Sequence, residues 1–302
     1  MDKNIPEFLK EMLINQYGEE KTIEIIQGYT AKRRSSFRVN PIKASKDEIK
    51  AVLEEIGVGY EEVSWYENAF VISFEDEQKL RETTLYEEGK IYFQSLSSMI
   101  PVLVLAANPE ENVLDMAAAP GGKTTQMFAE ANGKVLITAC EKNKIRAERL
   151  KYNLEKQGAS RVNVMMQDAR KLDDFFSFDK VLLDAPCSGS GTLFLNDEKQ
   201  IQTFTKELVN RSITTQKEML QKALKVLKVG HEMVYSTCSI LHAENEGQLE
   251  KLLESGKIEI LPIDADKFKG MKTLNTTIPG VLCVCPDENY EGFFVANIKR
   301  LK

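Results

Sequence analysis

The chain has 302 residues, of which 42% are apolar and 28% are charged, and its formal net charge is −6. This composition is typical of a soluble globular protein, and the length fits one large domain or two smaller ones. The negative charge argues against a protein that coats nucleic acid nonspecifically, because neutralising phosphates requires clustered cations. No apolar run approaches the roughly 20 residues that cross a bilayer. The charged start MDKNIPEFLKEML lacks the apolar segment of a signal peptide, so we expect a cytoplasmic protein.

The N-terminal third predicts a small α+β module. Residues 5–28 place apolar side chains between charged ones, as a helix does. SSFRVNP predicts a strand, and Ser45 caps a helix that Gly57 ends. Further strands are predicted in YEEVSWYENAFVISF and GKIYFQS. We place the domain boundary so that the module covers residues 1–95 and the second domain covers 96–302.

The segment AKRRSSFRVN concentrates positive charge within a few residues. Arg33, Arg34 and Arg38 follow Lys32, with serines and a phenylalanine between them. A solvated loop and a contact to RNA explain such a run equally well. The three arginines are therefore candidate RNA-binding residues.

From residue 110 onward, apolar strands alternate with amphipathic helices. Helices are expected from GKTTQMFAEA, in NKIRAERLKYNLEKQG with Ile145, Leu150 and Leu154 on one face, and in ITTQKEMLQKALKVLKVG up to Gly230. Strands are expected in NVLDMAA, GKVLITACE, RVNVMMQDA, FDKVLLDA and HEMVYST, with VLCVC and GFFVANIKR closing the sheet. This order indicates a mainly parallel, doubly wound α/β sheet of the Rossmann-like type. Ligands of such sheets bind beyond the carboxyl ends of the strands.

The first strand-end motif is LDMAAAPGGKTT. Small residues and paired glycines between a strand and a helix allow a ligand to approach the backbone closely. Gly122, Lys123 and Thr124 match the end of a phosphate-binding P-loop, but its opening glycine position holds Ala117, and no GxGxxG fingerprint is present. The candidate cofactor-binding loop comprises Ala117, Ala118, Ala119, Pro120, Gly121, Gly122 and Lys123.

Acidic residues follow the next three strands. Glu141 stands 20 positions after Gly121, a spacing that suits a carboxylate accepting hydrogen bonds from ribose hydroxyls. Asp168 and Asp184 end the third and fourth strands. Each acid alone could cap a turn, but together with the loop they favour a nucleoside-bearing cofactor. S-adenosylmethionine is the best candidate.

The cysteines and histidines do not indicate a disulfide framework or a metal site. Five cysteines in such a long chain do not indicate a disulfide framework, so a bond between Cys187 and Cys238 is not expected. Cys283 and Cys285 alternate in an apolar run, which favours a buried strand over a zinc site. We expect no metal. We expect structural roles for both histidines, His231 and His242.

Several motifs together resemble the NOL1/NOP2/Sun family of RNA cytosine-5 methyltransferases. They are DMAAAPGGKTT, DAPCSGSGT and YSTCSILHAENE, with FRVNP upstream and EGFFVANIK near the end. The similarity covers residues 35–299. It implies a Rossmann-like methyltransferase domain that uses S-adenosylmethionine, preceded by a smaller module that contacts RNA. DNA cytosine-5 methyltransferases use the cysteine of a Pro-Cys pair alone, whereas a second cysteine in TCS is typical of the RNA group.

The resemblance gives the two thiols their roles. Carbon 5 of cytosine is a poor nucleophile, and adding a thiolate to carbon 6 activates it, which is nucleophilic catalysis. Cys238 would be the nucleophile, and Cys187 would assist its release. Asp184 would hydrogen-bond the cytosine edge, and Lys123 would position the base or Asp184. Glu141 would hold the ribose, and Asp168 would hold the adenine amine. Arg146 would form an ion pair on its helix rather than contact the cofactor.

The expected partner is structured RNA, with ribosomal RNA preferred over transfer RNA, and the enzyme is expected to be a monomer. Two other functions remain open. One is a cofactor-binding RNA assembly factor whose catalysis is dispensable, and intact Asp184, Cys187 and Cys238 argue against it. The other is an ATP- or GTP-using enzyme, against which the absence of glycine at position 117 argues.

Overall fold

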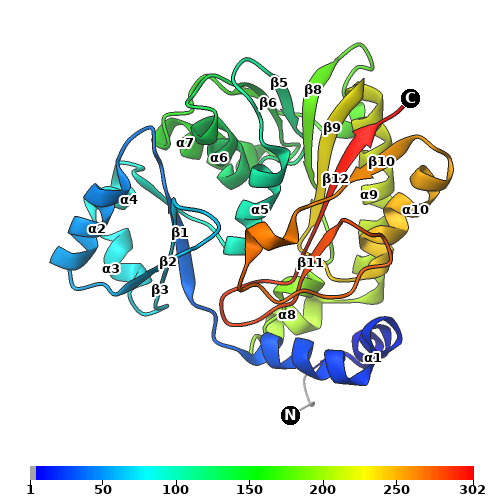
Figure 1. Ribbon diagram of the computed structural model, residues 1–302, viewed down its shortest axis with the longest axis horizontal. Coiled ribbons are helices and arrows are strands. Elements are labelled where there is room, and N and C mark those ends of the chain that lie inside the picture. Colours follow the sequence, from blue (N-terminus) through cyan, green and yellow to red (C-terminus); the bar gives the residue numbers. More distant parts are fainter. Residues whose placement is uncertain (1–4) are drawn as a thin grey trace.

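The computed structural model describes residues 5–302, which form two sheets (Figure 1). The smaller sheet is antiparallel, with the order β2-β3-β1-β4. Its strands and helices are β1 (Ser35–Val39), α2 (Lys46–Glu55), β2 (Tyr60–Glu62), β3 (Ala69–Ile72), α3 (Glu77–Arg81), α4 (Thr84–Glu87) and β4 (Ile91–Phe93). The predicted strands and helix of the module are confirmed, including the cap: Ser45 Oγ accepts the Glu48 N–H at 3.2 Å.

The larger sheet has eight strands within residues 5–302, in the order β10-β12-β9-β8-β5-β6-β7, with β11 paired to β12. Strands β5 to β9 are parallel, whereas β10, β11 and β12 pair antiparallel. The strands are β5 (Asn112–Asp115), β6 (Leu136–Cys140), β7 (Asn163–Met165), β8 (Phe178–Asp184), β9 (Leu227–Thr237), β10 (Ile258–Leu261), β11 (Leu282–Val284) and β12 (Phe293–Arg300). The predicted mainly parallel sheet is therefore confirmed.

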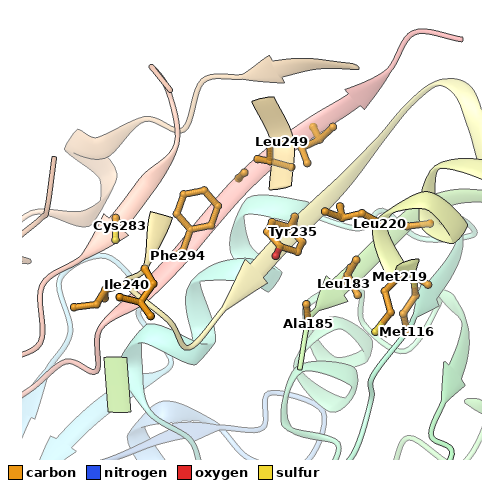
Figure 2. Packing of buried hydrophobic residues seen from close by; sticks show 14 of the residues in the cluster. Met116, Leu183, Ala185, Met219, Leu220, Tyr235, Ile240, Leu249, Cys283 and Phe294 are labelled. Atoms are coloured by element: carbon orange, nitrogen blue, oxygen red, sulfur yellow. The ribbon is translucent and has the colours of Figure 1, made fainter. Parts of the chain in front are cut away.

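Helices cover both faces of this sheet. Buried side chains of α5, α6 and α7 form one cluster with the sheet, and those of α9 and α10 form the other. Figure 2 shows part of the second cluster, in which Leu220 of α9 faces Leu183 of β8 and Tyr235 of β9. The helices are α5 (Leu96–Leu105), α6 (Gly122–Glu130), α7 (Lys144–Lys156), α8 (Glu198–Thr203), α9 (Lys206–Val226) and α10 (Glu246–Glu254), and the 3-10 turns are η1 (Ala169–Lys171), η2 (Ser190–Thr192), η3 (His242–Glu244) and η4 (Ala265–Phe268). In the part of the chain that is described, no helix combines the length and apolarity needed to cross a bilayer.

Two details of the predicted helices are wrong. Ile145 is 70% exposed, and Ala147 takes its place on the buried face of α7 beside Leu150 and Leu154. Spacings of three and four residues share a helix face, whereas the five residues from 145 to 150 do not. Helix α9 ends at Val226 rather than near Gly230, because the next residue already pairs with β8.

Helix α1 (Glu7–Thr30) packs on the second domain although it precedes the module in the chain. Leu9, Leu13 and Ile25 belong to the same buried cluster as β8, β9 and β12. Figure 1 shows α1 beside α8, away from the module. Its helical conformation is interrupted at Gly18, whose φ is +79°. The helix predicted over 5–28 is confirmed, and the boundary between 95 and 96 stays a prediction.

The FRVNP motif joins the module to the second domain. Arg38 is fully buried and donates to the Gly122 carbonyl at 3.0 Å and to Thr125 Oγ1 at 2.6 Å. Asn40 Nδ2 donates to the Gln157 carbonyl at 2.9 Å. These bonds hold β1 against the start of α6 and the end of α7. Hydrogen bonds between buried polar groups fix the relative position of two packed parts, although Arg38 Nη1 has no hydrogen-bond partner among the described residues.

Candidate active site

The loop between β5 and α6 brings backbone to the carboxyl edge of the sheet. At Gly121 φ is +110°, and a Cβ there would lie 3.0 Å from Leu150 Cδ1, so glycine is required on both counts. The residues before it are small, and they line a cavity of about 190 Å³ together with Tyr92, Lys123 and Asp184. The loop therefore exposes backbone rather than side chains to this cavity.

Lys123 and Asp184 form an ion pair in the wall of this cavity, which we call the catalytic cavity. Lys123 Nζ lies 2.7 Å from Asp184 Oδ2 and donates to Ser98 Oγ at 2.6 Å. Ser236 Oγ donates to Asp184 Oδ1 at 2.8 Å. Both carboxylate oxygens are thus oriented, and each retains a lone pair for a further donor.

Asp115 is a site residue that the sequence reasoning did not select. It lines the catalytic cavity, is 1% exposed, and accepts hydrogen bonds from Thr124 Oγ1 at 2.7 Å and from the Ala117 N–H at 3.4 Å. Burial, only partly offset by these bonds, raises the pKa of Asp115 to about 6. The carboxylate is therefore costly to ionise in this position.

A second cavity, of about 50 Å³, lies on the other side of Ala117 and holds the predicted nucleoside acids. Glu141 is buried, accepts the Asn143 N–H at 2.8 Å, and lies 3.5 Å from Arg146. Asp168 pairs with Arg170 at 2.6 Å, and this hydrogen bond lowers the pKa of Asp168. Both acids lie in the wall of one cavity, which we call the nucleoside cavity.

Arg146 forms an ion pair, but with a residue that precedes α7 and not on the surface of the helix as predicted, and it also borders the nucleoside cavity. Its partner is Glu141, and its second amino group donates to the Ala119 carbonyl at 2.7 Å. The arginine thereby connects the start of α7 to the loop after β5 and to the acid after β6. Whether it contacts the cofactor stays untested.

The two cysteines meet in space, as their strand-end positions predict. Cys187 and Cys238 are both free, and their sulfurs lie 2.6 Å apart in hydrogen-bond contact. Both are half-buried, and neither lines the two cavities. The hydrogen bond to Cys238, followed by burial, raises the pKa of Cys187 well above its ordinary value. Cys187 therefore holds its proton at neutral pH.

No helix begins directly after Cys238. The 3-10 turn η3 begins at His242, and α10 begins at Glu246. The chain between them and Cys238 is bound instead to α1. Gln16 Nε2 and Tyr17 Oη both donate to the Ile240 carbonyl, at 3.0 and 2.6 Å.

The carboxylate of Glu244 connects the two loops that carry Cys187 and Cys238. It is fully buried, and its carboxylate accepts hydrogen bonds from the Ser188 N–H at 2.8 Å and from Ser239 Oγ at 2.6 Å. Gln216 Nε2 donates to it at 3.2 Å. Because each serine directly follows one of the cysteines, the glutamate fixes both thiols through their neighbours.

Gly191 of the DAPCSGSGT motif and Gly292 of the EGFFVANIK motif are in backbone contact. The Gly191 N–H donates to the Cys238 carbonyl at 3.0 Å, and the Gly292 N–H donates to the Gly191 carbonyl at 2.8 Å. A Cβ at Gly191 would lie 1.9 Å from the Gly292 carbonyl oxygen. The two backbones approach so closely that no side chain fits between them.

The predicted RNA-contacting arginines separate in the structure. Arg38 is buried between the two parts of the protein, so its prediction as an RNA contact is wrong. Arg33 is half-buried and donates to the carbonyls of Thr192 and Leu193 at 3.1 and 3.2 Å. Arg34 pairs with Glu61 at 2.9 Å on the surface. The three arginines differ in their burial, and the sequence does not show how buried each one is.

Cys283 and Cys285 are buried at β11, as the apolar run predicts, and burial raises the pKa of Cys285 to about 12. His231 lies on β9, with Nδ1 3.1 Å from the Asp179 carbonyl oxygen. His242 pairs with Glu250 at 2.8 Å. Within residues 5–302, no group of three or more histidine, cysteine or acidic residues is placed to hold a metal.

Comparison with known families identifies this arrangement. The family described as 16S rRNA methyltransferase RsmB/F matches residues 102–299. The chain belongs to the RsmB/F methyltransferase family. The N-terminal domain of 16S rRNA methyltransferase RsmF matches residues 5–96. This is the NOL1/NOP2/Sun family that the motifs indicate, and its methyltransferases use S-adenosylmethionine.

Individual relatives agree with the RsmB/F assignment. Ribosomal RNA small subunit methyltransferase F of Shewanella sp. strain ANA-3 is 35% identical over 280 residues, which cover 89% of this chain and 57% of that protein. The same enzyme of Shewanella oneidensis is 35% identical over 285 residues, with coverages of 92% and 60%. The chain thus spans well under two thirds of the length of these curated relatives.

Solved structures share the whole fold. A methyltransferase homologue from Pyrococcus horikoshii has a TM-score of 0.83 and 29% identity, covering 98% of this chain and 95% of its own. NSun6 from Pyrococcus horikoshii, solved with SFG, has a TM-score of 0.88 at 21% identity and covers 99% of both chains. The predicted Rossmann-like domain with an N-terminal module is confirmed.

Asp115 generates a prediction about stability and pH. A pKa of about 6 in the folded protein exceeds the ordinary 3.9, so the folded state binds more protons between about pH 4 and 6. The contribution of Asp115 to the free energy of unfolding is fully present below pH 4 and is lost as the pH rises through 6. Relative to wild type, Asp115→Asn should gain about 3 kcal/mol between pH 4 and 7, measured by urea unfolding.

Asp168→Asn supplies the opposite control. Arg170 lowers the pKa of Asp168, so its stabilisation is present above the ordinary pKa and is lost as the pH falls. The Asp168→Asn variant should therefore lose stability relative to wild type as the pH rises. A difference between wild type and Asp115→Asn that does not change with pH would contradict the assignment.

Gly191 generates a prediction about packing. Gly191→Ala forces apart the two backbones that hold Cys238, and overpacking of this kind costs about 1–3 kcal/mol. We expect a lower melting temperature and a loss of any activity that depends on Cys238. The matched control is Gly59→Ala, where a Cβ meets nothing within 4 Å, and equal melting of the two variants would refute the prediction.

Proposed function

We propose that this chain is an S-adenosylmethionine-dependent RNA cytosine-5 methyltransferase that acts on small-subunit ribosomal RNA. The observation that carries the proposal is the contact of Cys187 with Cys238 beside the Lys123–Asp184 pair. Carbon 5 of cytosine is inert until a thiolate adds to carbon 6, so two thiols at one sheet edge match the needs of this reaction. Membership of the RsmB/F family supports the same conclusion.

The residues at the sheet edge fit the methyl donor. Glu141 would hold the ribose hydroxyls, and Asp168 the adenine amine, in the nucleoside cavity. The loop from Ala117 to Gly122 would bind the amino acid portion along the catalytic cavity, where its residues are small. Bound there, the donor supplies an electrophilic methyl group. A nucleoside is larger than 50 Å³, so the half-exposed side chain of Arg146 would move outward as it binds.

The Lys123–Asp184 pair would bind the target base. The Asp184 carboxylate, oriented by Lys123 and Ser236, would accept hydrogen bonds from the donor edge of the cytosine near N3. Thiolate addition to carbon 6 makes N3 more basic, so N3 would take up a proton from water and donate it in a hydrogen bond to Asp184, which stabilises the adduct until that proton is lost again on elimination. Lys123 holds the Asp184 carboxylate in this orientation, which makes the lysine a positioning residue.

The two thiols would divide the covalent steps between them. Cys238 attacks carbon 6 as a thiolate, carbon 5 takes the methyl group, and loss of the carbon 5 proton to water expels Cys238 as a thiolate. Cys187 keeps its proton at neutral pH and lies in hydrogen-bond contact with Cys238. Its S–H would stabilise the sulfur of Cys238 as that sulfur leaves carbon 6.

The target that we propose is an unpaired cytosine of ribosomal RNA. A paired base cannot reach the sheet edge, so the target cytosine must be unpaired or flipped out. The relatives of this chain are small-subunit ribosomal RNA methyltransferases, which favours ribosomal RNA over transfer RNA. That the enzyme acts in the cytoplasm as a monomer stays a prediction.

Bisulfite sequencing tests the function directly. Ribosomal and transfer RNA from a strain lacking the gene would be incubated with the purified chain and S-adenosylmethionine. We expect one new 5-methylcytosine in small-subunit ribosomal RNA, absent from the untreated strain and present in its parent. Methylation of transfer RNA alone would reassign the substrate. No methylation of either, with S-adenosylhomocysteine bound, would indicate an assembly factor, and binding of ATP instead would favour the nucleotide alternative.

The thiol roles predict opposite outcomes for two variants. Cys238→Ala should abolish methyl transfer by at least 1000-fold, on the order of what removal of a covalent nucleophile costs, while leaving S-adenosylhomocysteine affinity unchanged. Cys187→Ala should accumulate a protein–RNA adduct that survives denaturing electrophoresis, because the leaving thiolate lacks its hydrogen bond. Cys285→Ala, a buried thiol remote from both cavities, should behave as wild type. An adduct with Cys238→Ala and turnover by Cys187→Ala would exchange the roles.

A further inference from the structure

A cavity of about 710 Å³ lies between the N-terminal module and the loop that follows Cys187. Its walls come from residues 30–36, from Phe74 in the turn after β3, and from Phe194, and we call it the module groove. The mechanism makes no use of it. Residues 93–95 line both the module groove and the catalytic cavity, so the two spaces adjoin.

The module groove is positively charged in an acidic protein. Four basic residues line it, against two carboxylates, so its lining has a net charge of +2 in a chain of net charge −6. Two of the cations, Lys32 and Arg34, pair only with the exposed acids Glu75 and Glu61. Exposed ion pairs contribute little to stability, so phosphate groups can replace these acids at small cost.

Aromatic rings accompany the cations. Phe74 is 56% exposed, and Lys32 Nζ lies 5.3 Å from the centre of its ring. The Arg81 guanidinium lies 4.2 Å from the centre of the Phe93 ring. Cations interleaved with accessible aromatic rings are the means by which proteins bind single-stranded nucleic acid, because every base offers a face for stacking.

We propose that the module groove binds the unpaired nucleotides next to the target cytosine. A base stacks on Phe74, and Lys32 and Arg34 contact the backbone phosphates on either side of it. The groove shares residues 93–95 with the catalytic cavity, so a strand lying in it would bring the next base toward Lys123 and Asp184. The volume of the module groove is within the range of ligand sites. The inference rests on the proposed function for the identity of the RNA.

Equilibrium binding of RNA without the methyl donor tests the groove. The probe is a fluorescein-labelled hairpin of the methylated ribosomal sequence, with the target cytosine in its unpaired loop. Phe74→Ala should weaken binding about 5- to 150-fold, the range found for loss of one base–aromatic stack. Phe175→Ala, which removes a 96% exposed ring far from any of the cavities described, should leave the affinity unchanged.

An abasic scan locates the stacked base. Removing the base that stacks on Phe74 should weaken wild-type binding as much as Phe74→Ala does, and combining the two changes should cost no more than either. Additive losses at every loop position would overturn the proposal, because they would place no base against this ring. A structural effect of the substitution would lower the affinity without this non-additivity.

Salt dependence tests the phosphate contacts. Lys32→Gln with Arg34→Gln should flatten the slope of log affinity against log salt by about 0.7 for each lost contact, or about 1.4 in total. Lys134→Gln, a cation outside the groove, should not change it. An unchanged slope in the double variant would overturn the assignment of these two residues.

The two proposals fail separately. Failure of the proposed function appears as no methyl transfer by the wild-type chain, whatever its affinity for RNA. Failure of the groove appears as wild-type RNA affinity and an unchanged kcat/KM in Phe74→Ala, while the wild type still methylates. Unchanged binding of S-adenosylhomocysteine confirms that the Phe74 variant is folded.

Discussion

The pairing of β8 with β9 determines where the reactive groups of this protein lie. The parallel register sets Asp184 beside Ser236, and these two residues are joined by a hydrogen bond at the strand ends. Each strand then continues into a loop that carries a cysteine, three residues after Asp184 and two after Ser236. Because one residue of slip in this register would turn the side chains of the slipped strand to the other face, the contact of the two sulfurs depends on the packing of the whole sheet.

Support for the thiols comes from parts of the chain that carry no chemistry. Glu244 binds the residue after each cysteine, α1 binds the Ile240 carbonyl through Gln16 and Tyr17, and the Gly191 N–H binds the Cys238 carbonyl. A buried carboxylate is expensive to desolvate, but one that accepts hydrogen bonds from both loops prevents them from separating. Helix α1 therefore serves the second domain, although it precedes the module in sequence.

The sequence predicts the elements and the chemistry better than it predicts the contacts. Strand-end Asp184, Cys187 and Cys238 could be placed together because parallel strands end at one edge of a sheet. Arg38 was assigned to RNA because a cluster of arginines looks the same whether it is exposed or buried. Asp115 and Glu244 were overlooked for a related reason: a single acid within a motif gives no sign of what it accepts from, and only the fold brings Ser188, Ser239 and Thr124 to them.

The distribution of charge gives the site a direction. Carboxylates line the cavities along the cofactor loop, including Asp115, Glu141 and Asp168. The lining of the catalytic cavity, with Asp115, Asp184 and Lys123, has a net charge of −1, which favours a cationic sulfonium ligand over phosphate. In the nucleoside cavity the acids are balanced by basic residues, including Arg146 and Arg170. The net positive lining of the module groove lies beyond residues 93–95. Lys123 stands between the two regions, and the Arg38 hydrogen bond to the Gly122 carbonyl links its position to the module. In the arrangement that we propose, donor and RNA would therefore reach the lysine from different cavities.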